Sequence, residues 1–152
     1  MSPRAVPATE LKSLVGQEIG VSDWVTIEQD RIDRFADATG DHQWIHVDPK
    51  RAENGPFGST IAHGFLTLSL IPALAWQVYT VEGARLSVNY GLNKLRFITP
   101  VKVGSRVRAR LAVASVEDVP GDALQVATTV TVELDGAEKP AAVAETLTRV
   151  FL

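Results

Sequence analysis

Residues 62–80, AHGFLTLSLIPALAWQVYT, decide the fold of this chain. As a helix, this stretch is apolar on nearly every side, and a helix of that kind has to be surrounded by protein. It is shorter than the roughly 20 predominantly apolar residues that a membrane-spanning helix needs, and it contains Thr67, Ser69 and Gln77. We therefore predict a buried helix rather than a membrane segment, kinked or ended early at Pro72.

The chain that follows this helix has the patterns of β-strands. Alternation is clearest at 106–113, where arginines take turns with apolar side chains. Turn signals separate the candidate strands, which lie at 85–90, 94–98, 106–113, 126–134 and 141–152. An antiparallel meander of this kind has to bury one face, and the apolar helix is available to cover it. This predicts an α+β protein in which an antiparallel sheet wraps around one central helix, the arrangement called the hot-dog fold.

The segment before the apolar helix is expected to hold smaller elements. Thr26 and Gln29 have the spacing of a capping box, which predicts a helix from Thr26 to the helix-ending Gly40. Asp48 precedes a proline and suits the cap of a short helix at 49–54. A short edge strand is predicted at 20–25. We expect a single domain over residues 1–152, with residues 1–10, which include two prolines, as a loose arm.

Composition excludes several classes of function. The net charge of −3 gives no electrostatic footprint for nucleic acid. The chain has no cysteine, which excludes disulfides, thiolate nucleophiles and cysteine metal sites. With three histidines in 152 residues, a histidine-rich metal site is not expected either, and we predict no cofactor. The first ten residues lack the apolar run of a signal peptide, so a cytoplasmic protein without a membrane partner is expected.

Reactive side chains are concentrated in GDHQWIHVD, residues 40–48. Adding water to a conjugated double bond requires one group that takes a proton from water and another that delivers one to carbon. An aspartate and a histidine suit these tasks, because histidine titrates near neutral pH and burial tunes a carboxylate. Asp41 and His46 are the candidates. At the start of the apolar helix, Gly64 would expose backbone N–H groups to a thioester oxygen, as an oxyanion hole.

Two stretches of the sequence resemble the MaoC-like, R-specific enoyl-CoA hydratases, also called hydratase 2. These are FADATGDHQWIHVD (35–48) and AHGFLTLSLIPAL (62–74), with a further likeness in NYGLNKLRF (89–97). The family signature runs roughly F-A-x-x-[ST]-G-D-x-N-P-[IL]-H-x-D. The chain matches it at Phe35, Ala36, Thr39, Gly40, Asp41, Ile45, His46 and Asp48. It departs at Gln43 and Trp44, where the family usually has Asn-Pro.

This resemblance implies a reaction and a set of roles. Water would add reversibly to a trans-2-enoyl thioester and give the R-3-hydroxyacyl product, a hydro-lyase reaction of fatty acid metabolism. Asp41 and His46 would share the proton transfers, the Gly64 N–H would hold the thioester oxygen, and His63 and Asn89 would support the site. The substrate would be an acyl-CoA or acyl-carrier-protein thioester. The resemblance also implies a homodimer with two active sites near the interface. The residue content of the chain, with no cysteine and three histidines, predicts that no metal is bound.

Two other functions fit a hot-dog domain. One is hydrolysis of an acyl thioester, which commonly needs a carboxylate on the central helix; no acid lies between Gly64 and Thr80. The other is a partner subunit of a two-protein 3-hydroxyacyl dehydratase. Such partners usually lack the Asp/His pair, which this chain has.

Overall fold

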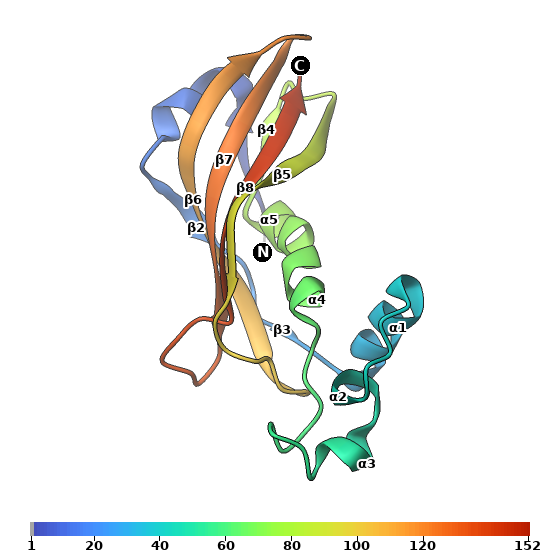
Figure 1. Cartoon of the computed structure of the whole chain (residues 1–152). Coiled ribbons are helices and arrows are strands. Elements are labelled where there is room, and N and C mark those ends of the chain that lie inside the picture. Colours follow the sequence, from blue (N-terminus) through green and yellow to red (C-terminus); the bar gives the residue numbers. More distant parts are fainter. Residues whose placement is uncertain (1) are drawn as a thin grey trace.

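The computed structural model describes residues 2–152 and has the predicted hot-dog architecture, a curved antiparallel sheet with a central helical segment on its concave side (Figure 1). The strand order in the sheet is β2-β6-β7-β8-β5, and β3 also pairs with β6. The strands are β2 (Glu18–Val21), β3 (Val25–Thr26), β5 (Leu86–Phe97), β6 (Arg106–Val119), β7 (Ala123–Leu134) and β8 (Ala142–Phe151). Two strands predicted at 85–90 and 94–98 are one strand, because β5 continues through two register irregularities.

The apolar stretch forms two consecutive helices, α4 (Gly64–Ser69) and α5 (Ile71–Val78). The interruption at Leu70 precedes Pro72, as the sequence predicts, because proline fits the first turn of a new helix but not the interior of an old one. Leu66 and Leu74 pack against the inner face of the sheet in the main hydrophobic cluster. In the part of the chain that the structure describes, no helix has the length and apolar character required to cross a membrane.

The loose arm predicted at residues 1–10 is wrong for the described part of that segment; Met1 lies outside the described residues. Strand β1 (Arg4–Pro7) pairs in parallel with β4 (Tyr79–Glu82), and a 3-10 helix, η1 (Ala8–Leu14), follows it. Val6 and Leu11 are 1% and 0% exposed in a second hydrophobic cluster. The free energy gained by burying these two side chains offsets the conformational entropy that the segment loses when it becomes ordered.

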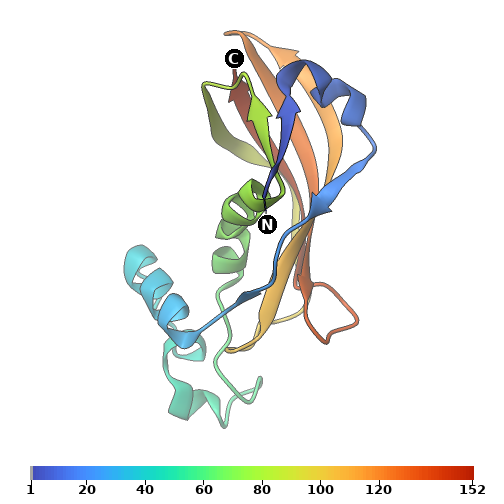
Figure 2. The same cartoon turned by 180° about the vertical axis from the view of Figure 1, so that it is seen from behind.

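Three helices lie together beyond the N-terminal end of α4 (Figure 2): α1 (Gln29–Thr39), α2 (Trp44–Val47) and α3 (Pro49–Ala52). Gly40 ends α1 with a φ of 84°, and the Asp48 side chain caps α3 by accepting from the Arg51 N–H; both were predicted. The predicted capping box at Thr26 is wrong. Helix α1 begins only at Gln29, its first turn has no side-chain cap, and the Gln29 amide bonds elsewhere.

Candidate active site

Asp41 and His46 are placed by two short local structures. The left-handed Gly40 turns the chain out of α1, so that Asp41 follows on a loop with an exposed side chain. Its carboxylate accepts a long hydrogen bond of 3.4 Å from the Gln43 N–H. The single turn of α2 then carries His46 inward, where its side chain is buried. The sequence Gly-Asp-x-x-x-x-His therefore brings an accessible carboxylate beside a buried imidazole.

The ring of His46 is held in one orientation. Its Nδ1 lies 2.7 Å from the Ile61 carbonyl oxygen. A carbonyl can only accept, so Nδ1 carries the proton and the neutral ring offers the lone pair of Nε2. Nε2 is thus the atom of His46 that can take a proton.

Gln29 secures the backbone of the same residue. Its side-chain amide donates to the His46 carbonyl at 2.7 Å, and its amide oxygen accepts from the Thr60 hydroxyl at 2.5 Å. The spacing of Thr26 and Gln29 predicts a helix cap and does not indicate this role. The signal is absent from the local sequence, because both partners lie on other segments of the chain.

His63 forms one wall of the site. Its Nε2 donates to the backbone carbonyl of Asp41 at 3.0 Å, and its ring stacks on that of His46, with centroids 3.8 Å apart and planes inclined by 23°. The ring of Phe35 lies on it at a centroid distance of 4.9 Å. His63 is buried, and within the described residues its Nδ1 has no hydrogen-bond partner.

The carboxylate of Asp41 and ring nitrogens of His46 and His63 lie within 4.8 Å of one another. Burial is the main cause that lowers the pKa of His46; the neighbouring His63 lowers it further, while the bond to Ile61 and the charge of Asp41 oppose both. His46 is therefore neutral at neutral pH and suited to act as a base. The same three residues have donor types found in metal sites.

Gly64 follows His63 directly and is the first residue of α4, so its N–H has no intrahelical partner. A Cβ atom at this position would lie 2.7 Å from the ring of Phe97, so the site has no room for a side chain. Gly64 also lines a small cavity together with Thr67 and Phe97. The predicted residues Asp41, His46, His63 and Gly64 therefore belong to one region of the molecule.

Asn89, the remaining predicted site residue, is not part of that cluster. It lies on β5 and lines a different cavity, of about 620 Å³, between α5 and the inner face of the sheet. Neighbours of Asn89 in this cavity include Tyr79 and three threonines of the sheet.

The chain is similar to known proteins over most of its length. The model of the MaoC like domain family matches residues 10–136. The 3-hydroxyacyl-thioester dehydratase Z of Mycobacterium tuberculosis is 57% identical over 140 residues, which cover 92% of this chain and 93% of that protein. The nodulation protein N of Rhizobium leguminosarum bv. viciae is 45% identical, with 91% and 88% covered.

The chain is also similar to solved structures of hydratases. The (R)-hydratase from A. caviae involved in PHA biosynthesis superposes with a TM-score of 0.71 at 26% identity, over 88% of this chain and 94% of that one. An R-hydratase from Pseudomonas aeruginosa superposes with a TM-score of 0.68 at 29% identity, over 90% and 81%.

Proposed function

This chain belongs to the MaoC-like dehydratase family and is a hydro-lyase of the hydratase/dehydratase type, and on that premise we propose that it is an R-specific enoyl-CoA hydratase. It adds water reversibly to a trans-2-enoyl thioester and forms the R-3-hydroxyacyl thioester, in fatty acid metabolism. The observation that carries the proposal is the pairing of an accessible carboxylate with a neutral, oriented imidazole beside the start of α4.

Asp41 and His46 share two proton transfers in this proposal. One proton leaves the attacking water as its oxygen bonds to C3 of the acyl group, and one proton is delivered to C2. The electron pair of the 2,3 double bond forms the new C2–H bond, so the pair of side chains ends with the protons it began with. The Nε2 lone pair of His46 and the carboxylate of Asp41, which belong to one cluster of side chains, would exchange these protons with the water and the substrate.

Gly64 supplies the electrostatic part of the mechanism. When C2 gains or loses a proton, the thioester passes through an enolate-like state with negative charge on its oxygen. The N–H of Gly64 has no intrahelical partner at the start of α4, and Gly64 lines a small cavity from which the thioester oxygen would reach it. Such a donor stabilises the charge when it develops and therefore lowers the barrier.

A homodimer is part of the proposal, because the protomer leaves apolar surface uncovered. Phe65 and Trp76 on the central helices are 64% and 68% exposed, and the edge strand β5 exposes Val88, Tyr90 and Leu92. A helix that is apolar on nearly every side needs cover on its outer side as well. Pairing two copies along β5 would satisfy that edge and bury both apolar surfaces around one two-fold axis.

A direct assay separates this function from its alternatives. Purified protein is mixed with trans-2-enoyl-CoA thioesters of several chain lengths, and loss of the conjugated double bond, release of free CoA and product configuration are measured. We expect loss of the double bond without CoA release, and an R product. Release of CoA would identify a thioester hydrolase instead, and an S product would contradict the stereochemical assignment. Activity only after addition of a second protein would identify a partner subunit.

A further inference from the structure

The inner face of the sheet has apolar side chains at both ends and polar side chains between them, although close packing alone does not call for polar groups there. Near α4 it is apolar, with Val130 opposite Ala144 and Val132 opposite Ala142. Near the C-terminal end of β8 the inner face is apolar again, with Leu124 opposite Val150 in the second hydrophobic cluster.

Between the two hydrophobic clusters lies a polar patch, which consists of Asn89, Thr128, Thr146 and Thr148. Thr128 stands opposite Thr146 across β7 and β8, and Asn89 stands opposite Thr148 across β5 and β8. Thr128 is buried, Thr146 and Thr148 are partly buried, and Asn89 is exposed. Alternation on a half-buried sheet calls for apolar side chains at the three threonine positions. Valine has nearly the shape of threonine, with a methyl group in place of the hydroxyl, so close packing alone does not call for these hydroxyls. Among them, the Thr128 hydroxyl has a partner within the protein, the phenol of Tyr79.

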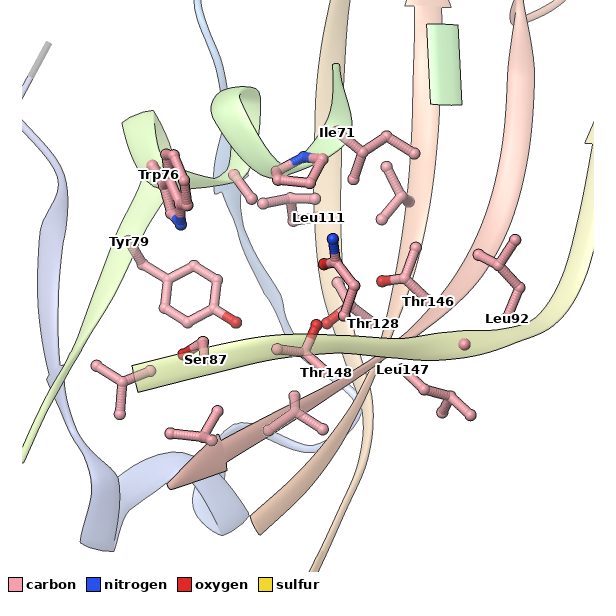
Figure 3. Close-up of a pocket in the computed structure, with 18 of the residues that line it drawn as sticks. Ile71, Trp76, Tyr79, Ser87, Leu92, Leu111, Thr128, Thr146, Leu147 and Thr148 are labelled. Atoms are coloured by element: carbon pink, nitrogen blue, oxygen red, sulfur yellow. The ribbon is translucent and has the colours of Figure 1, made fainter. Parts of the chain in front are cut away.

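All members of the polar patch line the cavity of about 620 Å³. Figure 3 shows Thr128, Thr146 and Thr148 on its sheet side, facing Ile71 and Trp76 of α5. The phenol of Tyr79 is also directed into this space. Burial raises the pKa of that phenol, and a side-chain hydrogen bond with Thr128 lowers it in part, so the group is a neutral donor at neutral pH.

The cavity is well placed for the acyl part of a substrate held at Gly64. Leu68 and Ser69, one helical turn after Gly64, form the near part of its wall. At 1.5 Å of rise per residue, that wall begins about 6 Å from the start of α4. In a substrate held in this way, the carbons of the distal part of the acyl chain, beyond the reacting double bond, would reach the polar patch. The volume lies in the range of about 300–1,000 Å³ that is usual for sites of drug-sized ligands.

We propose that this cavity selects an acyl group that carries an oxygen substituent, a keto or hydroxyl group, on the distal part of its chain. The inference rests on the proposed hydratase function and deepens it by naming a substrate class. The hydroxyls of the polar patch and Tyr79 supply the hydrogen bonds to that oxygen, and the apolar side chains of α5 cover the carbon chain. A plain alkyl chain would displace water from the hydroxyls without replacing its hydrogen bonds, which costs affinity.

The test compares two thioesters and three proteins. The substrates are trans-2-decenoyl-CoA and the same thioester with a keto group on the distal half of the chain. The proteins are the wild type, the triple variant Thr128→Val/Thr146→Val/Thr148→Val, and the control Thr129→Val, which changes an exposed threonine of the same strand on the opposite face. The readout is the ratio of kcat/KM for the two substrates.

We expect the wild type and the control to favour the keto substrate about tenfold or more, since hydrogen bonds contribute about 1 kcal/mol each. The triple variant should lose most of that preference and gain on the plain substrate. A wild type without preference, or a ratio that the triple variant leaves unchanged, would overturn the inference while hydration itself stands. An equal loss on both substrates would also overturn it, because the hydroxyls would then contact a part that both thioesters share.

Two further outcomes are separable. If the triple variant does not fold, the wild-type ratio and the single variant Thr146→Val decide in the same way. If the wild type hydrates neither thioester, nor shorter or longer ones, the proposed function fails and this inference fails with it.

Discussion

The imidazole rings of His46 and His63 stack at a centroid distance of 3.8 Å, and each ring is tied by one nitrogen to a backbone carbonyl. The carbonyl that accepts from His63 belongs to Asp41, so His63 touches both members of the proposed catalytic pair. It orients Asp41 through the backbone and restricts His46 through its ring face. We therefore regard His63 as a positioning residue.

Two substitutions of His63 distinguish the contribution of its hydrogen bond to turnover from that of its stacked ring. His63→Gln retains a donor near the place of Nε2, whereas His63→Leu has none. We expect turnover to fall in both, and more in the leucine variant, by about one order of magnitude between them, because only that variant also releases the carbonyl of Asp41. The measurement is kcat on an enoyl-CoA, with thermal unfolding as the control. Equal losses in the two variants would show that the hydrogen bond has no part in positioning.

The pH dependence follows from the lowered pKa of His46. Burial disfavours the imidazolium, so the neutral base persists below the usual histidine pKa of about 6.5. As pH falls, kcat/KM should therefore decline with an apparent midpoint below that value. His63 contributes to the lowering of the His46 pKa, so the midpoint should move up in the His63→Leu variant, in which the leucine keeps the His46 ring buried. A wild-type midpoint at or above 6.5 would argue against His46 as the base.

Substitutions of Gly64 can distinguish the loss of its backbone N–H from the steric clash of an added side chain with Phe97. Any Cβ atom there meets Phe97, so Gly64→Ala and Gly64→Pro should both perturb the fold, and Phe97→Ala should relieve each of them. Proline fits the first position of a helix, and the φ and ψ of His63, −59° and 139°, suit a residue that precedes proline. In the Phe97→Ala background, Gly64→Ala should recover turnover, while Gly64→Pro should remain about 10²–10³-fold slower because it lacks the N–H.

The outcome that would contradict the oxyanion role is equal turnover of the two double variants. Circular dichroism and thermal unfolding of both show whether the comparison is between folded proteins.

The exposed apolar surface predicts the behaviour of the protein in solution. Trp76→Glu and Tyr90→Glu place charges on the central helix and on the edge strand that a second copy would cover. We expect the wild type to sediment as a dimer and the double variant to shift towards monomer with loss of activity. Glu138→Lys, on an exposed loop, is a matched control that changes charge elsewhere. A wild type that is a fully active monomer at all concentrations would contradict the homodimer.

Local signals in the sequence predicted local structure well. The end of α1 at Gly40, the cap of α3 at Asp48 and the break before Pro72 each depend on the conformational preference of one residue, and all three are confirmed. The central helix and the meander also follow from hydrophobic pattern alone.

Features that depend on distant partners could not be predicted in this way. Strand β1 forms because β4 lies beside it, and nothing in residues 4–7 identifies that partner. Gln29 has the spacing of a cap but is used to hold His46 and Thr60. The stacking of His46 on His63 likewise requires the fold to bring two separate segments together.

The central claim is that Asp41 and His46 perform the proton transfers, and steady-state hydration of a trans-2-enoyl-CoA by Asp41→Asn and His46→Gln tests it most directly. Each variant keeps the approximate size of the side chain and removes its ability to exchange a proton. We expect each substitution to lower kcat by about 10²–10⁴-fold, with thermal unfolding close to that of the wild type. A folded variant of either residue that retains a near-wild-type rate would contradict it.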